Sequence, residues 1–84
     1  MPESFIVTIA NDSGSFQIDL EIPSGLVFAE MKEKLLEILR NVGEQDFFGW
    51  QDCALRYKNH ILSGDETLAD VGAFDGSRLA VVKI

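Results

Sequence analysis

The sequence has few of the residues on which catalysis and metal binding depend. It contains one cysteine, Cys53, and one histidine, His60, so an intrachain disulfide is excluded and a reducing cytoplasm is favoured. A zinc site needs four ligands with paired spacing, which two residues cannot supply. The glycines are too widely spaced for a phosphate-binding loop, and the acidic pairs lack the alternating ligands of a calcium loop. We therefore expect no enzyme, no metal site and no cofactor.

Both of these side chains have ordinary structural interpretations. His60 lies in a predicted turn, where we expect exposure to solvent rather than a catalytic role. Cys53 precedes a predicted strand, where we expect it to pack as a small apolar side chain rather than to act as a reactive thiol. Nucleophilic catalysis would need such a residue beside a base, and the sequence predicts no such pair.

Basic residues and long apolar runs are also scarce. Seven basic residues stand against fourteen acidic ones, which gives a formal charge of −7. This charge repels phosphate backbones and anionic headgroups, so we expect neither nucleic acid nor a membrane surface as partner, and a basic or neutral protein surface instead. The apolar run near the N-terminus, residues 5–10, is too short for a signal peptide or a membrane span. We expect a cytoplasmic protein without membrane insertion.

The length allows one hydrophobic core. Eighty-four residues make one domain, residues 1–84, and leave no room for a second core. Because 46% of the residues are hydrophobic, the composition argues against disorder.

Two alternating segments open the chain. Phe5, Val7 and Ile9 alternate with less apolar residues, and the apolar residues of 16–22 alternate with polar ones. The turn-forming residues 11–14 lie between the two segments, so the pattern predicts an antiparallel hairpin.

The pattern then changes to the period of a helix, which we expect from Val27 to Asn41 and to end at Gly43. The predicted apolar face consists of Phe28, Met31, Leu35, either Ile38 or Leu39, and Val42. We expect this face to cover the sheet and to make most of the core contacts.

A segment without a clear period, residues 44–52, follows the helix and carries three aromatic residues, Phe47, Phe48 and Trp50. We interpret them as closing the open end of a small core. If two of them are exposed and contiguous, an interface becomes the better interpretation.

The next predicted strand runs from Ala54 to Lys58, with Leu55 and Tyr57 inward and with Arg56 and Lys58 outward. Asn59 and His60 then form a predicted tight turn into the short segment Ile61–Leu62.

The last third of the chain contains three consecutive local patterns. Residues 63–65 form a predicted turn, and Thr67 and Asp70 have capping-box spacing, which predicts one short helical or 3₁₀ turn. A second reversal at Asp75 and Gly76 leads into a β-rich strand over residues 78–82.

The ordered run S-G-x-x-T-L-x-D-x-G-x-x-D-G-x-R-L, residues 63–79, resembles the second half of ubiquitin-like β-grasp domains. It more closely resembles the YukD/EsaB branch, the small ubiquitin-like proteins of bacterial type VII (WXG100) secretion systems. The resemblance implies an α+β fold in which a mixed sheet of four to five strands packs on one helix. It also implies a non-catalytic, cytoplasmic accessory that binds or regulates cytosolic components of the secretion machinery.

Two functions fit a ubiquitin-like fold. A modifier or sulfur carrier needs a flexible tail ending in Gly-Gly, because only glycine lets an activating enzyme approach the backbone closely. The sequence ends in the predicted strand and Lys83-Ile84, so we expect no conjugation if the chain is complete.

The second function is non-covalent protein binding through the outer face of the sheet. On the predicted alternation Arg56, Lys58, Ala80 and Val82 point outward, and either they form a binding patch or they are ordinary surface residues. We further expect that the edge of the final strand offers a route to a homodimer.

Overall fold

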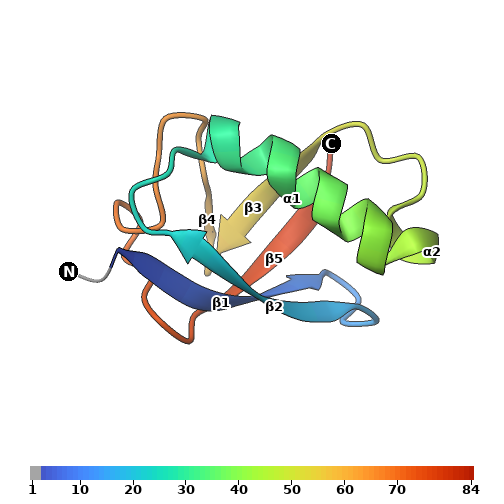
Figure 1. Cartoon of the computed structure of the whole chain (residues 1–84), viewed down its shortest axis with the longest axis horizontal. Helices are drawn as coiled ribbons and strands as arrows, with labels where there is room; N and C mark the ends of the chain where they lie inside the picture. The colour runs from blue at the N-terminus through green and yellow to red at the C-terminus, as the bar shows by residue number, and fades with distance from the viewer. Residues whose placement is uncertain (1–2) are drawn as a thin grey trace.

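A five-stranded sheet carries the main helix on one face, as seen in the computed structural model, which describes residues 3–84 (Figure 1). The elements in chain order are β1 (Ser4–Asn11), β2 (Gln17–Pro23), α1 (Phe28–Val42), α2 (Glu44–Phe47), β3 (Cys53–Tyr57), β4 (His60–Ile61) and β5 (Arg78–Lys83). The strand order is β2-β1-β5-β3-β4. β1 and β5 are parallel and the other pairs are antiparallel, so the sheet is mixed as predicted.

The N-terminal hairpin agrees with its predicted register. Phe5 pairs with Ile22, Val7 with Leu20, and Ile9 with Ile18, so the apolar residues of both strands share one face. Those of β1 are buried, while those of β2 become less exposed toward Ile22. The alternation was a sound guide here because one face of the hairpin is covered and the other is open.

The helix begins within one residue of the predicted start, and Gly43 follows its last residue. Its N-terminus has no side-chain cap. The backbone N–H of Phe28 donates to the carbonyl of Glu66 at 2.8 Å, and that of Ala29 donates to the carbonyl of Gly64 at 2.9 Å. A turn from the last third of the chain therefore satisfies donors that a helix leaves unpaired.

The inward face of α1 differs from the prediction at two positions, Leu36 and Val42, and a third position was left open between two residues. Leu39 is fully buried and Ile38 lies at the surface, which decides between the two alternatives. Leu36, which was not predicted to face the core, is buried. Val42 was predicted to face inward and is 54% exposed. The core next to the last turn is filled instead by Phe47, whose ring lies against Gly43.

The segment after α1 was predicted without regular structure, and this was wrong for its first residues, which form the short helix α2. The ring of Phe47 is fully buried and makes edge-to-face contacts with Phe16 and Trp50, each at a centroid distance of 4.9 Å. Phe48 is 85% exposed. Two of the three aromatic residues therefore close the core, and only one is a surface residue.

The strand predicted over 54–58 is shifted by one residue, because β3 ends at Tyr57. Lys58 has a φ of 55° and lies in the turn. A reversal this tight needs a left-handed residue, and that conformation ends the strand before Lys58. The predicted turn residue His60 consequently begins β4.

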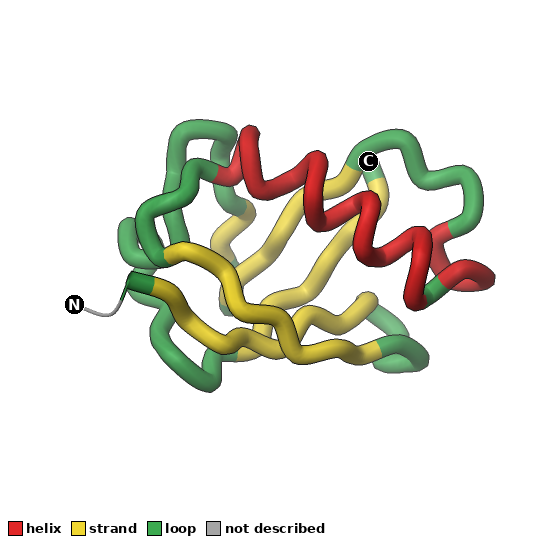
Figure 2. Tube along the Cα trace, in the orientation of Figure 1, coloured by secondary structure: helices red, strands yellow, loops and turns green. Residues whose placement is uncertain are grey.

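The connection from β4 to β5 has no regular element (Figure 2) but contains the predicted capping box. The Thr67 backbone N–H donates to the Asp70 carboxylate and the Asp70 N–H donates to the Thr67 hydroxyl, each at 3.0 Å. The residues between them form a hydrogen-bonded turn rather than a helix, with Leu68 fully buried. The reversal at Gly76, with φ 94°, leads into β5 as predicted.

The final strand is not at an edge of the sheet. β5 lies between β1 and β3, and the two edges are β2 and β4. Dimerisation through the edge of the final strand is therefore wrong, because both sides of β5 are already hydrogen-bonded. Among the described residues, no helix is long and apolar enough to cross a membrane.

Gly43 offers a test of packing at the end of α1. A Cβ atom there would lie 2.7 Å from ring atoms of both Phe16 and Phe47, whereas a Cβ atom at Gly25 would meet no atom within 4 Å. We expect Gly43→Ala to lower the free energy of unfolding by about 1–3 kcal/mol, the usual cost of overpacking. The matched Gly25→Ala should change it by less than about 0.5 kcal/mol or raise it. Urea denaturation measures both, and equal values would contradict this packing.

Candidate functional site

The outer face of the sheet, opposite α1, carries the side chains that alternate with the core residues. Three of its positions lie in a row across neighbouring strands, because Ala80 on β5 pairs with Ala10 on β1 and with Arg56 on β3. The residues on either side of Ala80 along β5, Leu79 and Val81, are buried toward the helix. Alternation thus gives β5 one face in the core and one on the outer face.

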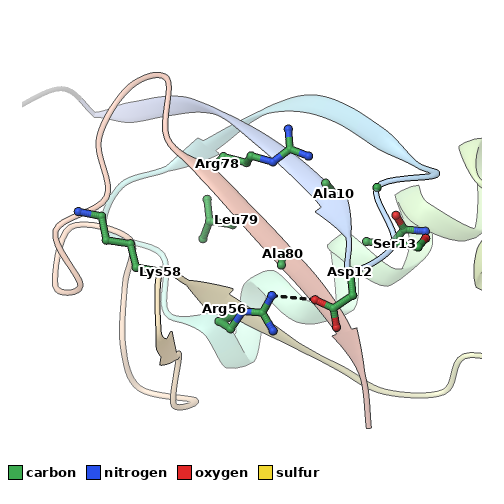
Figure 3. Close-up of a pocket in the computed structure, with 10 residues that line it drawn as sticks. Ala10, Asp12, Ser13, Arg56, Lys58, Arg78, Leu79 and Ala80 are labelled. Carbon is green, nitrogen blue, oxygen red and sulfur yellow. Dashed lines mark hydrogen bonds and ion pairs between the residues drawn. The ribbon is translucent and has the colours of Figure 1, made fainter.

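A hollow of about 290 Å³ lies on this outer face. It is lined by Ala10, Asn11, Asp12, Ser13, Gly14, Arg56, Lys58, Arg78, Leu79 and Ala80. Figure 3 shows Ala10 and Ala80 between the side chains of Arg56 and Arg78. The hollow therefore has a floor of small side chains between two long cationic ones.

Arg56 forms an ion pair at the hollow. Its Nη2 donates to Oδ1 of Asp12, in the β1–β2 turn, at 2.7 Å (Figure 3). The two side chains keep 39% and 59% of their surface exposed. An ion pair this open to water is weak, because solvent screens the attraction and both side chains lose freedom.

Arg78 is held by a neutral partner. Its Nη1 donates to the side-chain carbonyl of Gln17 at 2.9 Å, and no carboxylate within the described range 3–84 lies within salt-bridge distance of it. Next to it in the register, Thr8 donates its hydroxyl to Asp19 at 2.7 Å. The charge of Arg78 is therefore not neutralised by a direct ion pair.

The structure brings the four predicted site residues together only in part. Arg56 and Ala80 are register partners. Lys58 lines the hollow, but its side chain points away from the Arg56–Asp12 pair (Figure 3), and its ammonium lies 5.4 Å from the centroid of the Tyr57 ring. Val82 shares the outer face but pairs with Ala54, outside the hollow.

Two charged residues of the hollow, Arg78 and Asp12, were missing from the sequence prediction. Arg78 lies two positions before Ala80 on the same strand, so the alternation alone could have identified it. Asp12 lies in a turn far from Arg56 in the sequence, and only the tertiary structure brings the two together.

His60 forms a hydrogen bond with a carboxylate rather than a catalytic pair with a nucleophile. Its Nε2 lies 2.8 Å from the Glu66 carboxylate, which also accepts the backbone N–H of Ser63 at 2.7 Å. The Ser63 N–H and then His60 lower the pKa of Glu66, because both stabilise its charged form. Among residues 3–84, no three His, Cys, Asp or Glu side chains converge as a metal site would require.

A second, smaller groove of about 110 Å³ lies between β2 and α1. It is lined mainly by apolar residues, among them Leu20, Ile22, Met31 and Leu35, with Lys34 as its one basic residue. This groove lies on the helix side of the molecule, so a charge change at Lys34 serves as a control for one on the outer face.

The described chain has the α+β fold of ubiquitin-like β-grasp domains, a five-stranded mixed sheet with one main helix. It is similar to the ubiquitin-like domain of EccD1, a type VII secretion system protein of Mycobacterium tuberculosis. The similarity covers 99% of this chain and 100% of that one, with 26% identity and a TM-score of 0.78.

Two further solved structures share the fold. The EccD5 ubiquitin-like domain from Mycobacterium xenopi is 18% identical, with a TM-score of 0.81 over 99% of this chain and 97% of that one. A chain of the MycP5-free ESX-5 inner membrane complex is 21% identical, with a TM-score of 0.77 over 99% of this chain and 21% of that one. No protein-family model and no curated protein matches the chain.

Cys53 offers a test of whether this fold exposes a reactive thiol. The side chain is fully buried, and burial, with a smaller contribution from Asp52, raises the pKa of the thiol to about 11. At pH 8 the thiolate fraction should fall by about a hundredfold relative to an ordinary thiol. We expect iodoacetamide to label the native chain at least that much more slowly than the urea-unfolded chain. Mass spectrometry measures both rates, Cys53→Ala defines the background, and equal rates would show an accessible thiolate.

Proposed function

We propose that the chain, as one ubiquitin-like domain spanning residues 1–84, is a non-catalytic and non-conjugating accessory of a bacterial type VII secretion system, in the manner of the YukD/EsaB family. The run of residues 63–79 that resembles this family supports the proposal. The 26% identity to the EccD1 domain over nearly the whole length supports a connection to the same kind of machinery.

The observation that carries the interaction function is the arrangement of the outer face. Arg56 and Ala80 are neighbours across β3 and β5 and border an open hollow, while Val82 continues the same face. Partly exposed arginine beside small apolar side chains is a composition that suits a protein interface, where arginine is enriched. We therefore assign docking to this face, with Lys58 at its periphery.

The proposed partners are cytosolic components of the secretion machinery, and the proposed location is the cytoplasm. A similar domain occurs within a chain of an inner membrane complex, which supports a partner in an assembly of that kind. A homodimer, if one forms, would use the edge strands β2 or β4, because the remaining strands are paired on both sides.

Charge reversal tests the face. We expect Arg56→Glu to reduce recovery of the secretion ATPase or channel proteins in a native affinity pull-down by at least about tenfold. The reason is that two like charges placed opposite each other across an interface cost several kcal/mol of binding free energy. Lys34→Glu makes the same charge change on the helix side and should retain recovery. Quantitative mass spectrometry measures both, after thermal melting has shown that both variants are folded.

The opposite results are informative. Recovery lost in Lys34→Glu and kept in Arg56→Glu would assign docking to the groove between α1 and β2. Partners that stay attached after denaturation and reduction would reveal a covalent bond and contradict the non-conjugating function.

A further inference from the structure

We propose that the hollow on the outer face binds a carboxylate side chain from an extended acidic segment of a protein partner, and that this carboxylate replaces Asp12 on Arg56. The inference rests on the proposed function as an interaction module. It adds the chemistry of the partner segment and a competing internal ligand at the same site.

Local charge is the first reason. The chain as a whole carries a formal charge of −7, yet Arg56 and Arg78 border this hollow, with Lys58 at its periphery, and the carboxylate among the described lining residues is that of Asp12. Clustered charge of one sign sets the local field that an approaching group experiences. Net charge alone predicts a basic or neutral partner; the local charge of this face favours the acidic one that we propose.

The available hydrogen-bond donors are the second reason. A guanidinium has five N–H donors and can bind a carboxylate through two parallel bonds. Arg56 donates only through Nη2 to Asp12, and Arg78 donates only to the neutral Gln17 among residues 3–84. Both arginines therefore keep donors for an incoming carboxylate.

The shape of the hollow is the third reason. Ala10 and Ala80 form the floor, and their side chains are too short to fill the space between the two guanidinium groups (Figure 3). A volume of about 290 Å³ lies at the lower end of ligand sites. It suits one acidic side chain with its neighbouring backbone rather than a cofactor.

Asp12 then acts as an internal ligand. It lies on the exposed turn between β1 and β2, and the water-exposed ion pair that it forms with Arg56 is the kind that a second carboxylate can displace at little cost. Removing the Asp12 charge should therefore free Arg56 and strengthen partner binding.

The experiment titrates the purified ¹⁵N-labelled 84-residue chain with two capped peptides and follows the binding by NMR. One peptide is acetyl-Glu-Ala-Glu-Ala-Glu-Ala-amide, and its matched control has glutamine in place of each glutamate. We expect the glutamate peptide to shift the amide signals of Ala10 and Ala80, and to bind at least about tenfold more tightly than the glutamine peptide, because a charge-assisted bond is lost in the latter. The affinity should fall as salt is raised from 50 to 300 mM.

Matched variants isolate the two arginines and Asp12. Arg56→Gln and Arg78→Gln should each weaken binding of the glutamate peptide by about tenfold, while Lys34→Gln, the same charge change on the helix side, should leave it within about twofold. Asp12→Asn should tighten binding by about two- to fivefold. Glu33→Gln removes one negative charge from the exposed face of α1 and should not tighten binding of the glutamate peptide.

A double variant provides the final control. If Asp12 acts by occupying Arg56, Asp12→Asn should have no effect in an Arg56→Gln background, as a double-mutant cycle requires. Equal binding of the two peptides, shifts confined to other surfaces, or equal effects of Asp12→Asn and Glu33→Gln would overturn the inference.

This assay contains no secretion component, so its failure is distinct from failure of the proposed function. Loss of secretion partners in Arg56→Glu together with no binding of the glutamate peptide would overturn the acidic-ligand inference and leave the function standing. Peptide binding at the hollow without recovery of secretion components would support the inference and overturn the function.

Discussion

The parallel pairing of β1 with β5 is the contact on which the rest of the structure depends. It joins the first strand to the last, and its partners Ile9 and Leu79 are almost completely buried. Parallel neighbours need a long crossover, and here the crossover contains β2, α1, α2 and the remaining strands. The helix can cover the sheet only when this central pairing has brought both halves of the chain under it.

The same pairing builds the outer face. Ile9 opposite Leu79 fills the core, and the next pair, Ala10 opposite Ala80, forms the floor of the hollow. A shift of one residue in this register would exchange the two faces of the strand. The core and the candidate binding site are thus two consequences of one alignment, and short side chains at the second pair leave room for a ligand that larger ones would fill.

The local charge at the hollow is opposite in sign to the net charge of the chain. An acidic chain disfavours phosphate and anionic lipid at a distance, while the positively charged hollow acts within the few ångströms over which its hydrogen bonds form. In the proposed recognition, long-range repulsion and short-range hydrogen bonding would therefore select different ligands. A protein segment with a few carboxylates can form the short-range hydrogen bonds without carrying the dense charge of a nucleic acid or a membrane.

The sequence by itself determined those features that depend on near neighbours. Hairpin alternation, the helical period and its end at Gly43, and the reciprocal bonds of Thr67 and Asp70 were all predictable, because each rests on residues at most a few positions apart. The resemblance of residues 63–79 added the β-grasp order, and the ubiquitin-like fold that it implied is the one observed.

Only the tertiary structure decided which distant groups meet. It left Val42 at the surface, placed β5 inside the sheet, supplied loop carbonyls to the unsatisfied start of α1, and set Asp12 against Arg56. None of these follows from local spacing, because each depends on contacts whose entropy cost is met only when the whole core has formed. The alternation of its strand predicted that Arg56 points outward. Its pairing with Asp12 and the hollow beside it depend on how three strands are placed together.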